Sequence, residues 1–156
     1  MTAAVTVVNN LPDVQVMTYR TPSGLHVILG TAIEVNDLIG KPWRLGGRGP
    51  DAYDCWGLVR EVLQRMRPGL PLPDWASDTM TRERQREIMA GAFPVFCEPT
   101  DELVHGVLLL SHRAAHIAVV VDRWALTARR FTGVVAMRAH AYAAQFPDLR
   151  AYTWRA

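Results

Sequence analysis

Cysteine is scarce in this sequence, which has only Cys55 and Cys97 among its 156 residues. Neither cysteine has the partner spacing of a zinc site. A single disulfide between the two is conceivable, but the chain begins without a secretory signal, and a reducing cytosol disfavours such a bond. Cys97 lies in an apolar, proline-bracketed stretch at 93–99, and we interpret it as a packed small hydrophobe.

Long apolar runs and an excess of one charge are also missing. No segment approaches the length of a membrane span, and residues 1–10 lack the basic start and apolar centre of a signal peptide. The formal net charge is only +2, which gives no argument for nucleic-acid binding. We therefore expect a globular protein that is made in the cytoplasm, with no membrane span and no nucleic-acid partner.

The stretch around Cys55 is the part of the sequence that most strongly indicates a catalytic residue. A glycine-rich loop at 40–50 leads into a helical pattern, with apolar residues three and four apart, that ends before Pro68. Asp54 is a good N-cap, because its carboxylate can accept hydrogen bonds from the first amides of a helix. Cys55 then takes the first helical position, where the helix dipole favours the reactive thiolate. A buried structural cysteine is the alternative interpretation.

Strand patterns dominate the second half of the chain. β-branched or apolar runs follow one another with short turns between them, which favours an antiparallel meander. A strongly charged helix predicted at 79–89 precedes them, so helices come first and strands follow. This order predicts an α+β domain. The predicted strands are 107–110, 117–121, 124–128 and 134–138.

His116 stands at the start of the second of these strands and is the candidate base for a nucleophilic cysteine. If residues 122–123 form a two-residue hairpin turn, the register places Thr127 diagonally beside His116 on the same face. The Thr127 hydroxyl can accept from the imidazole, although more weakly than an amide or carboxylate. His112 is the next candidate for this third position. His116 has two other interpretations. It can be a purely structural histidine, or it can form a zinc site with His112, although the sequence offers no further ligands nearby.

Residues 1–34 differ in character from the rest of the chain. Short β-branched runs and a turn signal at 22–24 predict a β-rich extension. The extension is too small to bury a core of its own, so it must pack on the main domain or on a partner. We therefore predict an extension at 1–34 and a catalytic domain at 35–156.

Residues 40–59, and above all DCWGLV at 54–59, resemble the nucleophile segment of the NlpC-type cell-wall cysteine peptidases. The sequence DCWGLV looks most like the corresponding segment in the branch of the family that is carried on bacteriophage tails. The likeness extends over 35–156, and it includes the segment that starts at His116 and an aromatic closing strand at 151–155. It implies a papain-like α+β fold, in which N-terminal helices carry the nucleophile at a helix start and pack on an antiparallel sheet.

The resemblance also implies roles for individual residues. Cys55 corresponds to the nucleophile and His116 to the base, while Thr127 stands where the family has His, Asn or Gln. Two tryptophans near the nucleophile differ from the family pattern. Trp43 stands where the family has a tyrosine that helps to bind the oxyanion, and Trp56 stands where most relatives have serine. The residues that the resemblance assigns to substrate binding are Trp43, Asp54 (which would hold a substrate amine) and Trp56.

The implied function is that of a peptidase on a phage tail, present in the virion, that opens the cell wall during genome entry. It would hydrolyse an amide bond in the peptidoglycan stem peptide beside a D-glutamyl unit, with other tail-tip proteins as partners and with no cofactor or metal. The main alternative is a structural tail-tip component with a weak or inactive pocket, which the Thr127 and Trp43 replacements favour. An acyltransferase or a toxin-type amidase on the same scaffold is a third possibility, because fold does not fix function.

Overall fold

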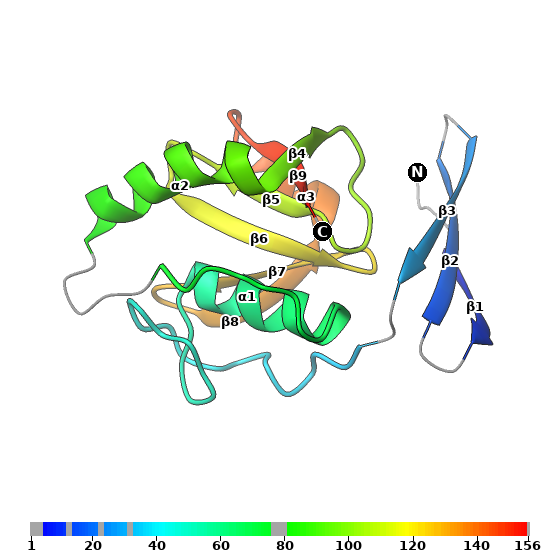
Figure 1. Cartoon of the computed structure of the whole chain (residues 1–156), viewed down its shortest axis with the longest axis horizontal. Helices are drawn as coiled ribbons and strands as arrows, with labels where there is room; N and C mark the ends of the chain where they lie inside the picture. Colours follow the sequence, from blue (N-terminus) through cyan, green and yellow to red (C-terminus); the bar gives the residue numbers. More distant parts are fainter. Residues whose placement is uncertain (1–4, 12–13, 22–23, 31–32, 76–80, 156) are drawn as a thin grey trace. The chain divides into compact units, whose positions relative to one another are not determined.

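The computed structural model describes residues 5–11, 14–21, 24–30, 33–75 and 81–155. Contacts divide the chain into two compact units, Met1–Glu34 and Val35–Ala156. The first unit holds an antiparallel sheet with the strand order β1-β2-β3 (Figure 1), in the region for which the sequence predicts β structure. Its strands are β1 at Val5–Leu11, β2 at Val14–Thr21 and β3 at Gly24–Gly30.

The second unit is built on an antiparallel sheet with the strand order β4-β9-β5-β6-β7-β8. Strands β5 to β8 are neighbours in chain order and form the predicted meander. The predicted closing strand, β9, lies between β4 and β5. The strands are β4 at Cys97–Thr100, β5 at Leu108–Ser111, β6 at His116–Val121, β7 at Trp124–Arg129, β8 at Gly133–Arg138 and β9 at Arg150–Trp154.

Helices pack on this sheet at different strands. Helix α1 (Cys55–Met66) contacts β6 and β7, while α2 (Arg82–Phe96) leads into β4 and contacts it (Figure 1). The short helix α3 (Ala139–Ala144) contacts β7 and β8. A helix that begins at the candidate nucleophile therefore packs on an antiparallel sheet, which confirms the predicted α+β, papain-like architecture.

Helix α2 and strand β4 differ from the sequence prediction. The helix predicted at 79–89 corresponds to α2, which continues to Phe96; residues 79–80 lie outside the described part of the chain. Helix propensity did not indicate this extension, because Gly91 and Pro94 lie within it; the longer helix leads directly into β4 and contacts it. Strand β4 was not predicted. It has little strand pattern of its own, and its pairing with the distant β9 stabilises it.

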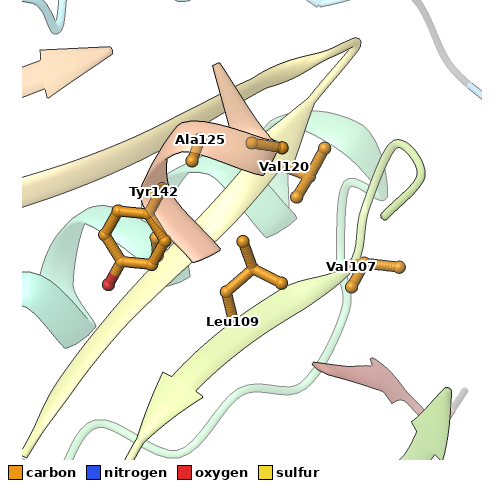
Figure 2. Close-up of a cluster of buried hydrophobic side chains, with 7 residues drawn as sticks. Val107, Leu109, Val120, Ala125 and Tyr142 are labelled. Carbon is orange, nitrogen blue, oxygen red and sulfur yellow. The ribbon is translucent and has the colours of Figure 1, made fainter. Parts of the chain in front are cut away.

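A cluster of apolar side chains joins α3 to the meander. Figure 2 shows Leu109 of β5, Val120 of β6 and Ala125 of β7 gathered near the ring of Tyr142 of α3, with Val107 beside them. All five residues are at most 1% exposed. The register pairs Ala125 directly with Val120. Since alternate residues of a strand share a face, the same face of the meander also carries His116 and Thr127.

The glycine-rich loop lies directly against the first turn of α1. Gly57 makes this approach possible, because a Cβ at residue 57 would overlap the carbonyl oxygen of Gly47. The same Cβ would lie 3.2 Å from Nη1 of Arg48. The backbone N–H of Asp54 donates to the Gly47 carbonyl at 3.2 Å, which ties the loop to the residue before the helix.

Replacing Gly57 with alanine should push the loop away from α1 and lower the free energy of unfolding by about 1–3 kcal/mol. The matched control is Gly91→Ala in α2, where an added Cβ meets nothing within 4 Å. The control should leave stability unchanged or raise it by up to about 1 kcal/mol, through helix propensity. Urea unfolding followed by circular dichroism measures both. Equal stability of Gly57→Ala and the parent would mean that the loop is not held at this point.

Candidate active site

The carboxylate of Asp54 fixes the start of α1. Its Oδ1 accepts hydrogen bonds from the Gly57 N–H and from Nη1 of Arg48, each at 2.7 Å, and its Oδ2 accepts one from the Gly46 N–H at 3.0 Å. The predicted N-cap is therefore present. Asp54 is only 1% exposed, and its donors all come from the protein itself. Both of its oxygens are thus engaged by protein donors, and the role of Asp54 in holding a substrate amine stays a prediction.

Cys55 is the first residue of α1 and lines a cavity of about 240 Å³. Two other predicted site residues, Trp43 and His116, line the same cavity. The positive end of the α1 dipole lies at Cys55, where it stabilises negative charge on sulfur. The remaining lining residues are Ala114, Ala115, Ala128, Arg129, Arg130 and Phe146.

His116 and Thr127 meet as the hairpin register predicts. Val121 pairs with Trp124 across the turn, and Oγ1 of Thr127 lies 2.7 Å from Nε2 of His116. The Thr127 hydroxyl also donates to the carbonyl oxygen of Ile117 at 3.0 Å. Since a hydroxyl has one proton, its oxygen faces the imidazole as an acceptor, and Nε2 carries the imidazole proton. Nδ1 is then the basic nitrogen of His116.

The alternative third residue, His112, has a different neighbour. Its Nε2 lies 3.4 Å from the hydroxyl oxygen of Tyr152 on β9. Thr127, in contrast, is fully buried, with an exposed fraction of 0%, in the strand next to His116. The Thr127 contact at 2.7 Å is made with the His116 ring itself, whereas the printed contact of His112 is with Tyr152. The geometry therefore favours Thr127 over His112 as the group that orients the imidazole.

The two tryptophans predicted to bind substrate lie in different environments. Trp43 lines the cavity, and its backbone forms a bridge with Tyr53, which holds the loop beside α1. Trp56 is only 3% exposed, and its indole Nε1 donates to the carbonyl oxygen of Pro73 at 3.0 Å. Its ring packs 4.5 Å from that of Trp75 and 5.9 Å from that of Trp154. Trp56 is thus packed in the interior, and its role in substrate binding stays a prediction.

Several residues at the cavity were not predicted from the sequence. Arg129 and Arg130 come from the end of β7 and the turn after it, and Phe146 follows α3. Arg129 lies two positions after Thr127, so the hairpin register was a usable signal for it. No sequence signal indicates Phe146, because only the folding of α3 onto β7 and β8 brings it to the cavity.

Tyr142 is a further unpredicted neighbour of the site. It is fully buried, and its ring centroid lies 6.3 Å from that of His116 and 5.0 Å from that of Phe146. Burial raises the pKa of the Tyr142 hydroxyl well above its usual value, and the negative charge of Cys55 adds to this effect. Tyr142 is therefore a neutral group that packs behind the imidazole.

Neither a metal centre nor a membrane helix emerges from the described residues. Within this part of the chain, His, Cys, Asp and Glu nowhere form a group of three or more that could hold a metal ion. The helices described here are too short or too polar to cross a bilayer.

Comparison with known proteins gives a match to the NlpC/P60 family over residues 40–137. The matched region contains Cys55, His116 and Thr127, together with α1 and strands β5 to β7. No curated protein matches the chain. Family members are cysteine peptidases, and the family as a whole indicates activity on the cell wall. Because the matched residues make up more than half of the sequence and include the Cys55 cavity, the chain belongs to the NlpC/P60 family.

Proposed function

We propose that this protein is a phage tail-associated cysteine peptidase that hydrolyses amide bonds in the stem peptides of peptidoglycan during genome entry. The observation that supports the reaction type is one cavity lined by Cys55, at a helix N-terminus, and by His116, whose Nε2 is held by Thr127. A nucleophile, a base and an orienting group are the parts that thiol catalysis requires. Family membership supports the cell wall as the substrate.

The proposed reaction begins with transfer of the Cys55 thiol proton to Nδ1 of His116. The thiolate attacks the amide carbon, and His116 returns the proton to the departing amine, which leaves a thioester on Cys55. Water, deprotonated by His116, then attacks the thioester carbon and releases the acid and the free thiol. We assign the backbone N–H of Cys55 and the indole N–H of Trp43 to the oxyanion.

The tail location is proposed from the resemblance of DCWGLV at 54–59 to phage-type relatives. The compact β1-β2-β3 unit supports it, because the outer strands β1 and β3 can pair with a strand of a neighbouring tail-tip protein. The site of action would then be the virion tail, and the partners would be the stem peptide and other tail-tip proteins. Antibody labelling of particles in electron micrographs tests this location.

One observation favours a second candidate function, a structural tail-tip component with a weak site. The third position is a neutral hydroxyl, which stabilises an imidazolium less than the amide or imidazole that the family has there. One direct measurement distinguishes the two candidate functions. It is the hydrolysis of defined muropeptides by the purified full chain.

The parent protein should release two fragments from a muropeptide with an intact stem, and mass spectrometry identifies the bond that is cut. Cys55→Ala removes the nucleophile and should abolish cleavage, while Cys97→Ala serves as the matched cysteine control and should retain it. If the folded parent leaves all muropeptides intact, the structural alternative is correct.

Limited iodoacetamide labelling near neutral pH should modify Cys55 and leave Cys97 unmodified. Cys97 is 1% exposed, and burial raises the pKa of its thiol to about 12, so it stays in the unreactive thiol form. Peptide mapping by mass spectrometry measures each site, and labelling in denaturant should modify both. Preferential reaction of Cys97 in the folded protein would contradict the choice of Cys55 as nucleophile.

Thr127→Val keeps the side-chain shape and removes the acceptor for His116. A hydrogen bond to a charged group contributes roughly 1.5–3 kcal/mol, so kcat should fall about ten- to a hundredfold. Thr127→Ser retains the hydroxyl and should retain most activity, and Thr127→Asn, with a residue typical of the family, should match or exceed the parent. Steady-state hydrolysis measures all three. An unchanged kcat in Thr127→Val would exclude Thr127 as the orienting group.

A further inference from the structure

Two aromatic rings lie beside the imidazole of His116. The ring centroid of Tyr142 is 6.3 Å from that of His116, and the ring centroid of Phe146 is 6.2 Å from it. The two contacts have nearly the same tilt, with interplanar angles of 39° and 38°. Tyr142 and Phe146 also contact each other, with 5.0 Å between their centroids. All three distances lie in the range in which aromatic rings attract one another, so the three rings form one contact group.

The spacing of Tyr142 and Phe146 explains how one segment carries both rings. The residues are four positions apart, and side chains at this spacing lie on the same side of a helical turn. Helix α3 ends at Ala144, but the chain continues to turn, since the Phe146 N–H donates to the Ala143 carbonyl at 3.3 Å. A short segment therefore presents two rings to His116 on β6.

Both rings are anchored in the apolar core. Tyr142 is 0% exposed and packs with Leu109 and Val120 in the cluster of Figure 2, and Phe146 packs against the same cluster. The hydroxyl of Tyr142 is near that of Thr127, but it forms no hydrogen bond of normal geometry within the described residues. A buried hydroxyl without a partner is unfavourable. The part of Tyr142 that contacts the site is therefore its aromatic ring.

The plane of an imidazole is not fixed by a hydrogen bond to one ring atom. Oγ1 of Thr127 lies 2.7 Å from Nε2 of His116, which determines the tautomer. The ring can still turn about this bond, and such a turn would move Nδ1 away from the direction of the Cys55 thiol. Rings that pack against the imidazole and are themselves buried in the core oppose this turn.

We propose that Tyr142 and Phe146 are positioning residues that hold the plane of the His116 imidazole, so that Nδ1 faces the Cys55 thiol. This inference rests on the proposed function, in which His116 takes the proton of the thiol. The two residues act through His116 and not on the reacting atoms. Their aromatic rings carry the effect, and the Tyr142 hydroxyl is not needed for it.

The test measures the rate at which iodoacetamide alkylates Cys55 near neutral pH in the full chain, because this rate depends on thiolate formation with His116 as the base. Tyr142→Leu and Phe146→Leu should each slow alkylation about two- to tenfold. Tyr142→Phe keeps the ring and should match the parent. The matched control is Tyr152→Leu on β9, which removes a buried tyrosine ring outside the cavity and should leave the rate unchanged.

Unchanged alkylation in the leucine variants would overturn the proposal. Phe146 is only half-buried, so Phe146→Leu decides the question even if Tyr142→Leu does not fold. A rate for Tyr142→Phe as low as that for Tyr142→Leu would also overturn it, since the hydroxyl beside Thr127 would then be the active part.

The same substitutions in a His116→Ala background separate positioning from a general loosening of the cavity. If the rings act through His116, Phe146→Leu should cause no further slowing once the imidazole is absent. Equal slowing of Cys55 alkylation in both backgrounds would overturn the proposal, because the rings would then support the thiol directly.

Hydrolysis is a separate measurement and distinguishes this inference from the proposed function. On a muropeptide that the parent hydrolyses, Phe146→Leu should lower kcat by a factor similar to that for alkylation and keep KM within about twofold. A rise in KM alone would make Phe146 a substrate-binding residue and overturn its positioning role. If the parent hydrolyses no muropeptide, slowing of Cys55 alkylation that depends on His116 would support the positioning role and contradict the peptidase activity.

Discussion

The rest of the site depends on the hydrogen bonds that the carboxylate of Asp54 accepts. One residue caps α1 through the Gly57 N–H, binds Arg48, and holds the glycine-rich loop through the Gly46 N–H. Because the loop is held there, Trp43 stands at the cavity and Cys55 begins the helix at its mouth. Gly57 permits the close approach. The start of α1 and the loop beside it are therefore held by the same carboxylate, and the positive end of the helix dipole lies at Cys55 as a result.

In the proposed mechanism, the group that orients His116 is Thr127, where the family has His, Asn or Gln. A threonine hydroxyl is neutral and has one proton, and here that proton goes to the Ile117 carbonyl. The arrangement fixes the tautomer of His116, since the hydroxyl oxygen can only accept from Nε2. It adds less stabilisation to an imidazolium than a charged acceptor would.

Features that depend on a local pattern could be predicted from the amino-acid sequence. Asp54 and Cys55 could be placed at a helix start because N-capping and apolar spacing are properties of a short segment. The position of Thr127 beside His116 followed from a two-residue turn, since strand register is fixed once the hairpin is known. The α+β class followed in the same way, from helices followed by a meander, and the resemblance around Cys55 supplied the family.

Tertiary structure decided every feature that depends on segments distant in the chain. Strand β4 exists because β9 pairs with it, and Phe146 reaches the cavity because α3 folds onto β7 and β8. The burial of Asp54 and Trp56 depends on Arg48 and on the packing of Trp75 and Trp154. The sequence shows which side chains can bind a ligand. Only the fold determines which of them remain available, because burial and internal partners are set by contacts between distant residues.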